Sequence, residues 1–306
     1  MTMRDVFFTG LYEYAKQDHD IVVVSADFSA PSLDQFRLNL PSQYIFAGIS
    51  EQSMILLATG LALEGKKVFC YAIAPFLTMR CFEQIRNYPA GMNLPITLVG
   101  VGAGLSYDDS GYTHHAVEDI AIMRCLPNMR VLQPCDNTDV LQMLELAMKS
   151  IHPLYLRLDR YGIDELFSGE RDMVSGFSVV KKVQNITIVA SGSMMRNALE
   201  ACEVLEKEDV SVGLVNLTSI PVDAEAFRKA MSGAQTVVSV EEHTLSGGIG
   251  SYLLELISDH AMNIKVRRLG LDLSEGFVEQ FGGRVILYQN YHMDSETVAT
   301  VVKNIL

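Results

Sequence analysis

Short apolar runs alternate with longer, helix-length segments along the whole chain. The apolar runs predict strands at 21–25, 67–71, 96–101, 130–133 and 154–158 in the first half, and at 186–190, 212–216, 236–240 and 265–269 in the second. The segments between them predict helices at 50–63, 76–88, 116–125 and 138–150, and then at 194–207, 224–231, 248–260 and 295–306. Strands that alternate with helices in this way build a mostly parallel sheet with helices on its faces.

The alternation breaks once, at 161–178, where the sequence carries Gly, Asp and Ser and shows weak periodicity. We expect this segment to be a linker. The pattern therefore predicts two α/β domains, at 1–160 and 179–306, each with a mostly parallel sheet flanked by helices. A length of 306 residues suits two domains. Residues 1–16 mix charges and tyrosines into an apolar pattern, which predicts an amphipathic helix and not a signal peptide.

Composition and charge narrow the classes of partner. The chain is 49% hydrophobic and 20% charged, as in ordinary globular proteins, and its formal net charge is −13. That charge argues against nucleic acid or an anionic membrane as a partner, because both need a basic surface. A small phosphorylated substrate stays open, since a few local Arg or His residues can hold a phosphate. The five Cys stand singly in apolar stretches, which predicts reduced core thiols and a cytoplasmic protein.

One acidic residue, Glu51, stands at the start of a helix that should be buried. It follows Gly48 and Ser50, and the helical residues after it are nearly all apolar. Two interpretations stay open. A carboxylate at a helix N-terminus can stabilise the helix dipole while half exposed, which is the more common case for an isolated sequence. A carboxyl in an apolar pocket can instead share a proton with a ring nitrogen.

A polar loop at 106–119 follows the apolar strand predicted at 96–101. It carries Asp109, Ser110, His114 and His115. Ligands of open parallel sheets bind beyond the carboxyl ends of the strands, so this loop is a candidate site. A metal cluster is the rival interpretation, but adjacent histidines are poorly spaced to share one metal. We expect His114 to act as a hydrogen-bonding or acid–base group.

Three further segments lie at predicted strand ends. Phe76 opens a predicted helix, where an aromatic is more often core than a surface that stacks on a cofactor. Arg160 can meet a phosphate or a carboxylate, and a surface salt bridge is an equally weighted alternative. Glu241 and Glu242 precede a Gly-Gly-Ile-Gly turn. Such a turn can cradle an anion, but the two acidic residues favour tight strand-to-helix packing.

In this order, the segments resemble the C-terminal half of the transketolase family, which includes 1-deoxyxylulose-5-phosphate synthase. The matching stretches are Ser25-Ala26-Asp27, Gly48-Ile49-Ser50-Glu51-Gln52, Phe76 with Arg80 to Arg86, Asp109 to Asp119 with Thr113-His114-His115, Leu126-Pro127-Asn128-Met129 with Pro134-Cys135-Asp136, Arg160, and Glu241-Glu242-His243 with Gly247-Gly248 and Gly250. Each piece alone is weak. So many pieces in register, over nearly the whole chain, are a strong signal.

The resemblance implies a pyrimidine-binding domain followed by a transketolase C-terminal domain, with thiamine diphosphate as the cofactor. In that family another domain holds the diphosphate and a divalent metal, Mg or Ca, through a Gly-Asp-Gly motif followed by Asn. This sequence has no Gly-Asp-Gly. We therefore expect one subunit of a split enzyme. Its partner is a separate chain that carries the N-terminal half, and the assembly is a heterotetramer with two copies of each chain.

The resemblance also implies roles for single residues around the cofactor. Glu51 matches the carboxyl that drives the aminopyrimidine of the cofactor to its imino form, in which the cofactor serves as its own base. Phe76 matches the ring that packs on the pyrimidine, with Phe82 as the fallback. Asp27 lies where the family lines the cofactor pocket. His114 matches the histidine that touches the hydroxyls of the donor.

Substrate contacts are implied in the same way, and the sequence departs from the family there. Arg160 matches the arginine that pairs with the acceptor's phosphate, and Ser32 is a further phosphate contact. Ser110 stands where the family has an Asp that reads a sugar hydroxyl, with Asp109 next to it. Gly102 replaces a phosphate-binding His of many transketolases. We therefore do not assume a standard pentose phosphate.

The leading hypothesis is a transketolase-type transferase that moves a two-carbon ketol unit from a ketose to an aldehyde, with sugars or sugar phosphates as substrates. One alternative is a 1-deoxyxylulose-5-phosphate synthase-like enzyme, and another is the beta subunit of a 2-oxo acid dehydrogenase. A third is a non-catalytic regulatory subunit that has kept only the fold. The presence of Glu51, Phe76 and His114 together argues against the last of these.

Overall fold

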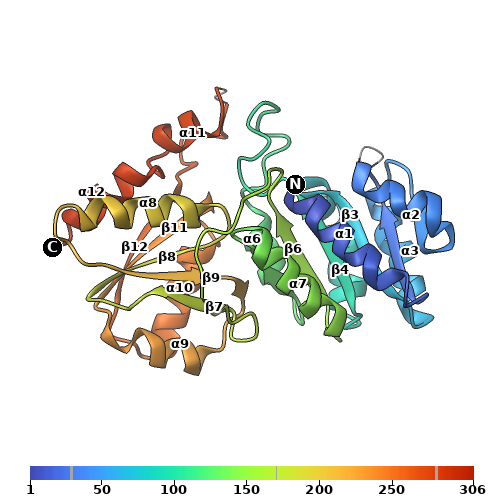
Figure 1. Cartoon of the computed structure of the whole chain (residues 1–306), viewed down its shortest axis with the longest axis horizontal. Helices are drawn as coiled ribbons and strands as arrows, with labels where there is room; N and C mark the ends of the chain where they lie inside the picture. The colour runs from blue at the N-terminus through green and yellow to red at the C-terminus, as the bar shows by residue number, and fades with distance from the viewer. Residues whose placement is uncertain (28–29, 170, 280–281) are drawn as a thin grey trace.

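The structure is a computed structural model that describes residues 1–27, 30–169, 171–279 and 282–306. Two sheets flanked by helices form its framework (Figure 1). The first sheet has the strand order β10-β5-β6-β4-β3-β1-β2, and the second has β12-β11-β8-β9-β7. Every strand pair is parallel except the pairings of β10 with β5 and of β7 with β9. The predicted fold class, two mostly parallel α/β sheets, is confirmed.

The strands of the first sheet are β1 (Ile21–Ser25), β2 (Tyr44–Phe46), β3 (Lys67–Ile73), β4 (Ile96–Val101), β5 (Arg130–Leu132), β6 (Leu154–Leu158) and β10 (Ser219–Ile220). The first half also contains α1 (Met3–Ala15), η1 (Pro31–Leu33), α2 (Asp34–Asn39), η2 (Pro41–Gln43), α3 (Glu51–Leu63), α4 (Ala74–Thr78), α5 (Phe82–Ile85), the π-helical turn η3 (Arg86–Ala90), α6 (Asp119–Arg124) and α7 (Asn137–Lys149). Strands β1, β4 and β6 are buried at every position, because helices cover both faces of a parallel sheet.

The strands of the second sheet are β7 (Phe177–Lys181), β8 (Ile186–Ala190), β9 (Gly213–Leu217), β11 (Thr236–Thr244) and β12 (Lys265–Leu271). Its helices are α8 (Met194–Glu206), α9 (Ala224–Ala230), η4 (Met231–Gly233), α10 (Ile249–Asp259), α11 (Arg284–Asn290) and α12 (Ser295–Lys303). Aspartates cap three helices of the chain, α7, α9 and α12, by accepting from backbone N–H groups of the first turn. No helix among the described residues is long and apolar enough to cross a membrane.

One predicted helix, at 76–88, is wrong. The structure has α4, α5 and the π-helical turn η3 there, and Cys81 between α4 and α5 leaves the helical conformation. The carbonyl of Arg80 accepts a hydrogen bond from Gln52 of α3 at 3.1 Å, outside any helix. Pro89 lies inside η3 and has no N–H to donate. This break turns Arg80 toward the start of α3.

The end of the predicted linker and one of the cysteines differ from what the sequence predicts. The linker predicted at 161–178 ends two residues early, because β7 begins at Phe177 as an edge strand with only two buried residues. Strand β10, from the second half of the chain, pairs with β5 of the first sheet, so the sheets are not cleanly separated along the sequence. The division into domains at 1–160 and 179–306 stays our proposal. Cys125 is exposed, whereas the other four cysteines are buried thiols as expected.

The Gly-Gly-Ile-Gly turn packs tightly on its own strand, as predicted. Glu241 accepts hydrogen bonds from the N–H groups of Ile249 and Gly250, at 2.6 and 3.0 Å, and thereby caps α10. A Cβ at Gly248 would lie 1.9 Å from a Glu241 carboxylate oxygen, so only glycine fits there. The positive helix end therefore already holds a carboxylate of this chain, and burial raises the pKa of Glu241 to about 7.

His243 links the two halves of the chain. Its Nε2 accepts a hydrogen bond from the N–H of Ala121 in α6 at 3.3 Å, and its Nδ1 lies 2.7 Å from the carbonyl of Thr244. The ring is therefore neutral, donating through Nδ1 and accepting through Nε2. Burial lowers the pKa of His243 to about 4.

We predict that this histidine makes the chain acid-sensitive. Because its folded-state pKa lies below its ordinary 6.5, its contribution to stability is present above pH 6.5 and is lost as the pH falls toward 4. The difference in unfolding free energy between wild type and His243→Gln should shrink by about 2 kcal/mol between pH 7 and 4.5. Urea unfolding at several pH values measures it. His152→Gln, at an exposed position, serves as the control, and a difference that stays constant with pH would contradict the prediction.

Candidate functional site

The predicted site residues gather at the carboxyl edge of the first sheet. Five neighbouring strands, in the order β6-β4-β3-β1-β2, end there. Arg160 follows β6, the 106–119 loop follows β4, Phe76 follows β3, Asp27 follows β1 and Glu51 follows β2. This is the edge at which open parallel sheets bind ligands.

Glu51 is buried, and its carboxylate pairs with one cation among the described residues. It is the first residue of α3 and is 4% exposed. Its Oε2 accepts a hydrogen bond from Nη1 of Arg80 at 2.8 Å. Ser50, the residue before the helix, does not cap it, because its hydroxyl bonds Ser53 instead. The burial excludes the half-exposed dipole carboxylate as an account of Glu51, and Arg80 with the helix N-terminus compensates its charge.

The guanidinium of Arg80 also lies over the ring of Phe76. Its Cζ is 4.4 Å from the ring centroid, which is the geometry of a cation–π contact. The carboxylate of Glu51 thus meets the edge of a flat, cationic, nitrogen-bearing group whose face rests on an aromatic ring. The Arg80 side chain is 46% exposed, so it can leave this position without a large loss of packing.

His114 borders the same aromatic ring. Its ring stands edge-on to Phe76 with centroids 5.1 Å apart, and 5.8 Å from the ring of Tyr107. Its Nδ1 lies 3.0 Å from the hydroxyl of Thr113. The structure therefore brings Glu51, Phe76 and His114 together in one place, with Arg80 between the first two.

Asp27 lies beside the buried ring of Tyr71. The phenol of Tyr71 donates to Asp27 Oδ2 at 3.1 Å, and the hydroxyl of Ser25 donates to the Asp27 carbonyl at 2.7 Å. Burial, with Asp27 next to it, raises the pKa of Tyr71, so the phenol keeps its proton and serves as the donor.

Arg160 and Asp109 form an ion pair at the outer part of the site. Nη1 of Arg160 lies 2.9 Å from Oδ1 of Asp109, and the two side chains are 36% and 66% exposed. Ser110 donates to the same oxygen at 3.0 Å. These hydrogen bonds, from Ser110 and then from Arg160, lower the pKa of Asp109. The guanidinium of Arg160 lies 4.7 Å from the centroid of the Tyr107 ring.

The other two predicted residues, Ser32 and Phe82, have different immediate neighbours. Ser32 is buried in η1 and lies next to Asp5 of α1. Phe82 packs, half-buried, against the apolar core of the first sheet. Of the two aromatics proposed to stack on the cofactor, the geometry favours Phe76. Sequence reasoning gave no role to Arg80 or Tyr107, although the spacing of Arg80 four residues after Phe76 fits an aromatic–cation pair on one helical face.

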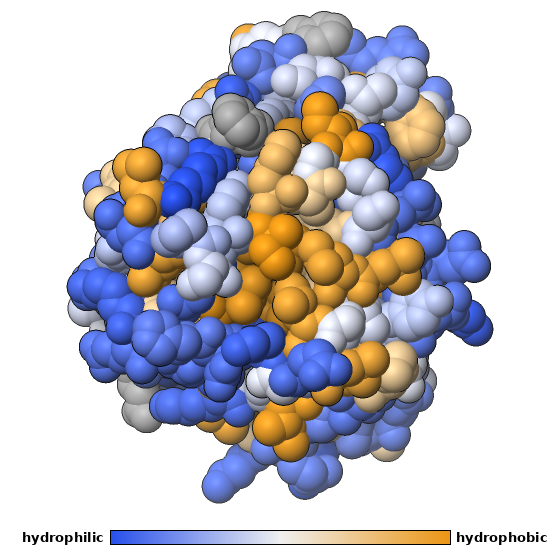
Figure 2. Space-filling model, turned by 90° about the vertical axis from the view of Figure 1, so that its right-hand side faces the viewer, coloured by the Kyte–Doolittle hydropathy of each residue, from blue (hydrophilic) through white to orange (hydrophobic). Residues whose placement is uncertain are grey.

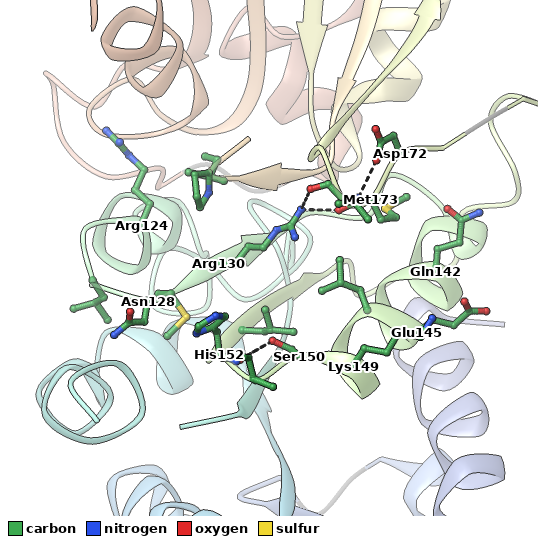
Figure 3. Close-up of a pocket in the computed structure, with 18 of the residues that line it drawn as sticks. Arg124, Asn128, Arg130, Gln142, Glu145, Lys149, Ser150, His152, Asp172 and Met173 are labelled. Carbon is green, nitrogen blue, oxygen red and sulfur yellow. Dashed lines mark hydrogen bonds between the residues drawn. The ribbon is translucent and has the colours of Figure 1, made fainter. Parts of the chain in front are cut away.

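A hollow with a volume of about 1250 Å³ lies elsewhere. Its lining includes the first residues of β5 and β6, Arg130 and Leu154, so it opens at the amino edge of the sheet. Figure 3 shows Arg130 turned toward the 171–174 segment, where it donates to the carbonyls of Met173 and Val174 at 2.6 and 2.9 Å. This hollow contains none of the predicted site residues.

One grouping among the described residues has metal-ligand chemistry: Cys135, Asp136 and Asp139, all buried. Arg171 fills the position of a cation there, with N–O distances of 2.8 Å to Asp136 and 2.6 Å to Asp139. The grouping is therefore a buried ion-pair cluster that ties Arg171 to the start of α7.

The chain resembles known proteins over nearly its whole length. Residues 1–163 match the family described as "Transketolase, pyrimidine binding domain", and residues 177–280 match "Transketolase, C-terminal domain". One of the subunits of the apulose-4-phosphate transketolase from Actinobacillus succinogenes is 32% identical over 92% of this chain and 91% of that protein. The 6-deoxy-6-sulfo-D-fructose transketolase subunit SqwH from a Clostridium species is 30% identical over 92% of this chain and 90% of that protein. A solved structure described as "Split gene transketolase, inactive beta4 tetramer" superposes with a TM-score of 0.87 at 31% identity, over 99% of this chain and 97% of that one.

Proposed function

The chain belongs to the transketolase family, and we propose that it is the subunit of a split transketolase that grips the pyrimidine ring of thiamine diphosphate. The complete enzyme would move a two-carbon ketol unit from a ketose to an aldehyde. The observation that carries this proposal is the arrangement of Glu51, Arg80 and Phe76: a buried carboxylate that bonds a flat cation resting on an aromatic ring.

Arg80 occupies the position that we propose for the pyrimidine ring of the cofactor. Its contacts therefore indicate what kind of group suits the site. A protonated aminopyrimidine and a guanidinium share three properties: both are flat, both carry N–H groups at the edge, and both have a face that packs on an aromatic ring. The site holds a group of that kind, with the carboxylate at its edge and Phe76 at its face. The residues therefore fit the cofactor's pyrimidine.

Each residue then has one task toward the bound cofactor. Thiamine diphosphate supplies a nucleophilic thiazolium carbon, provided that its own aminopyrimidine can act as a base. Glu51 would hold a proton at the pyrimidine nitrogen and so favour the basic form. Phe76 would fix the tilt of the ring, and Asp27 with Tyr71 would line the pocket next to it. His114, edge-on to Phe76, would hydrogen-bond a hydroxyl of the donor.

The outer ion pair suggests what the substrates carry. Arg160 is partly exposed and is already engaged by a carboxylate, so it can exchange that partner for another anion of similar geometry. The two relatives are named for a sugar phosphate and for a sulfonated sugar, both of which bear a terminal anionic group. We infer sugar substrates with a terminal phosphate or sulfonate, read by Arg160.

One face of the first sheet's helices is suited to a partner chain. Helix α3 is apolar on both sides: Met54, Ile55 and Ala58 face the core, while Leu56, Leu57 and Leu63 are 40–58% exposed. Figure 2 shows a broad hydrophobic area on the side of the molecule where Figure 1 places α3. An exposed apolar area of this breadth marks an interaction surface.

We propose that a separate chain with the diphosphate-binding half of a transketolase covers this α3 face. The face is continuous with the cofactor site, because Ile49, which is 88% exposed, lies two residues before Glu51. A chain seated there can hold the far end of a cofactor whose pyrimidine lies against Glu51. Such a partner would also supply the Gly-Asp-Gly motif and the divalent metal, Mg or Ca, in an assembly with two copies of each chain.

The experiment that tests the function is reconstitution. We expect the chain mixed with a partner that carries Gly-Asp-Gly, thiamine diphosphate and Mg²⁺ to transfer a ketol unit between anionic ketoses and aldehydes. Glu51→Gln should keep the assembly and lower kcat by about 10²- to 10⁴-fold, because a general acid–base contact is lost.

Glu64→Gln, at the other end of α3, is the matched control and should leave kcat unchanged. A near-normal rate with Glu51→Gln would remove Glu51 from the mechanism. Decarboxylation of pyruvate without ketol transfer would instead support the 1-deoxyxylulose-5-phosphate synthase-like alternative.

A binding experiment on the chain alone tests whether Arg80 occupies the position of the pyrimidine ring. Arg80→Ala should strengthen the binding of thiamine, which has the pyrimidine but no diphosphate, by about tenfold, because a half-exposed ion pair and a cation–π contact together contribute roughly 1–2 kcal/mol. Isothermal titration calorimetry measures the affinity. Arg86→Ala removes an exposed arginine nearby and should change nothing. Weaker thiamine binding by Arg80→Ala would show that Arg80 is a ligand of the cofactor and not its competitor.

The α3 face can be tested by assembly. The double variant Leu56→Ser, Leu57→Ser should weaken the affinity for the partner chain at least 100-fold, since burying each leucine contributes roughly 1.5–3 kcal/mol. Sedimentation at several concentrations gives the dissociation constant, and Leu254→Ser on α10 is the control. If the double variant dissolves a self-assembly of this chain but binds the partner normally, a second copy covers the face and the proposal is wrong.

A further inference from the structure

We propose that Arg284, which comes from the C-terminal half, is a positioning residue that fixes the substrate-facing pair Arg160 and Asp109. This inference rests on the proposed function, because it assigns the pair to acceptor recognition. It also gives the C-terminal half a task in the reaction, although that half contributes none of the cofactor contacts proposed above.

Arg284 is an almost buried cation between carboxylates from both halves of the chain. Its Nη1 lies 2.6 Å from Oδ2 of Asp159, at the end of β6, and its Nε donates to Oε1 of Glu242, on β11, at 2.8 Å. The exposed fractions of the Asp159 and Glu242 side chains are 2% and 1%. A single guanidinium thus neutralises two buried acids on neighbouring elements of different sheets.

The same residue also holds the 106–119 loop. The backbone N–H of Arg284 donates to Oδ2 of Asp108 at 2.9 Å. Nearby, the rings of Tyr112 and Phe277 stack with centroids 5.3 Å apart. In Figure 1 this loop rises at the top of the molecule near α11.

Two of the three acids that Arg284 holds are the chain neighbours of the substrate-facing pair. Asp159 precedes Arg160, and Asp108 precedes Asp109. Asp159 also accepts from the N–H of Tyr161 at 2.8 Å, so its carboxylate spans the backbone on both sides of Arg160. Arg284 therefore sets the separation of the strand end from the loop, and with it the distance between the guanidinium of Arg160 and its partners.

Glu242 is the fixed point of this arrangement. Besides Arg284 it receives hydrogen bonds from Ser193 at 2.9 Å and from Tyr288 at 3.0 Å. Burial alone would raise the pKa of Glu242, but Arg284 next to it lowers the pKa, so the carboxylate stays charged. A buried carboxylate that stays charged needs its cation, which keeps Arg284 in place.

A close approach at Gly104 brings the loop backbone against Glu242. A Cβ on Gly104, at the base of the loop, would lie 2.4 Å from the Cδ of Glu242. The loop backbone therefore rests directly on the side chain that holds Arg284. Movement of Glu242 or Arg284 would be transmitted to the loop without an intermediate layer.

The test compares variants in the reconstituted enzyme with a phosphorylated aldehyde acceptor and its unphosphorylated counterpart, glyceraldehyde 3-phosphate and glyceraldehyde. Asp108→Ala removes the loop's tie to the Arg284 backbone and leaves both buried carboxylates paired. Arg284→Gln removes the cation itself. Arg124→Gln is the matched control, because Arg124 also joins the two halves, but through Glu255 and the carbonyl of Gly247 instead of through the 106–119 loop.

We expect Asp108→Ala and Arg284→Gln to raise KM for the phosphorylated acceptor about tenfold, with kcat within twofold of wild type and KM for the unphosphorylated acceptor unchanged. Amide hydrogen exchange of 106–115 should become faster in both variants. Arg124→Gln should change none of these quantities. This division between the two acceptors separates positioning from a general loss of stability, which would lower both activities alike.

The proposed function and the role of Arg284 would be contradicted by different results. If the wild-type enzyme transfers no ketol unit to any acceptor, the proposed function fails. If wild type is active and Asp108→Ala raises KM for the phosphorylated acceptor no more than Arg124→Gln does, the role of Arg284 is wrong, and this holds even where Arg284→Gln does not fold.

Discussion

The structure depends above all on one buried carboxylate that cannot be left without a partner. Glu51 is withdrawn from water at the start of an apolar helix, and it is stable there because a cation meets it. That cation is supplied by a side chain that is itself half exposed and rests on an aromatic ring. A site built in this way holds a flat nitrogen-bearing group by its edge and its face, and it can exchange one such group for another.

The rest of the molecule keeps that site in register. Parallel strands end side by side and present the site residues at one edge, so the fold itself brings Asp27, Phe76, His114 and Arg160 near Glu51. The second half of the chain is joined to the first by buried polar contacts, those of His243 and Arg284 among them. On the outer side, the apolar surface of α3 is proposed to receive the chain that completes the cofactor site.

The local pattern of apolar and polar residues predicts an element correctly where one physical rule decides its structure. Strands such as β4 and β8 are continuous apolar runs, and their predicted bounds match the structure. The sequence also indicated Glu51, Phe76 and His114, because each stands at a strand end or a helix start. Strands β7 and β10 were not predicted. An edge strand with two buried residues and a strand of two residues leave almost no periodic pattern in the sequence. The roles of Arg80 and Arg284 depend on contacts between distant segments, which no local pattern encodes.

The most direct measurement of the central claim is an experimental structure of the assembled complex with thiamine diphosphate bound. The account predicts the carboxylate of Glu51 within hydrogen-bonding distance of a pyrimidine ring nitrogen, the pyrimidine face on Phe76, and Arg80 withdrawn from that ring. A structure in which Arg80 still bonds Glu51 over Phe76, with the pyrimidine bound elsewhere, would contradict it.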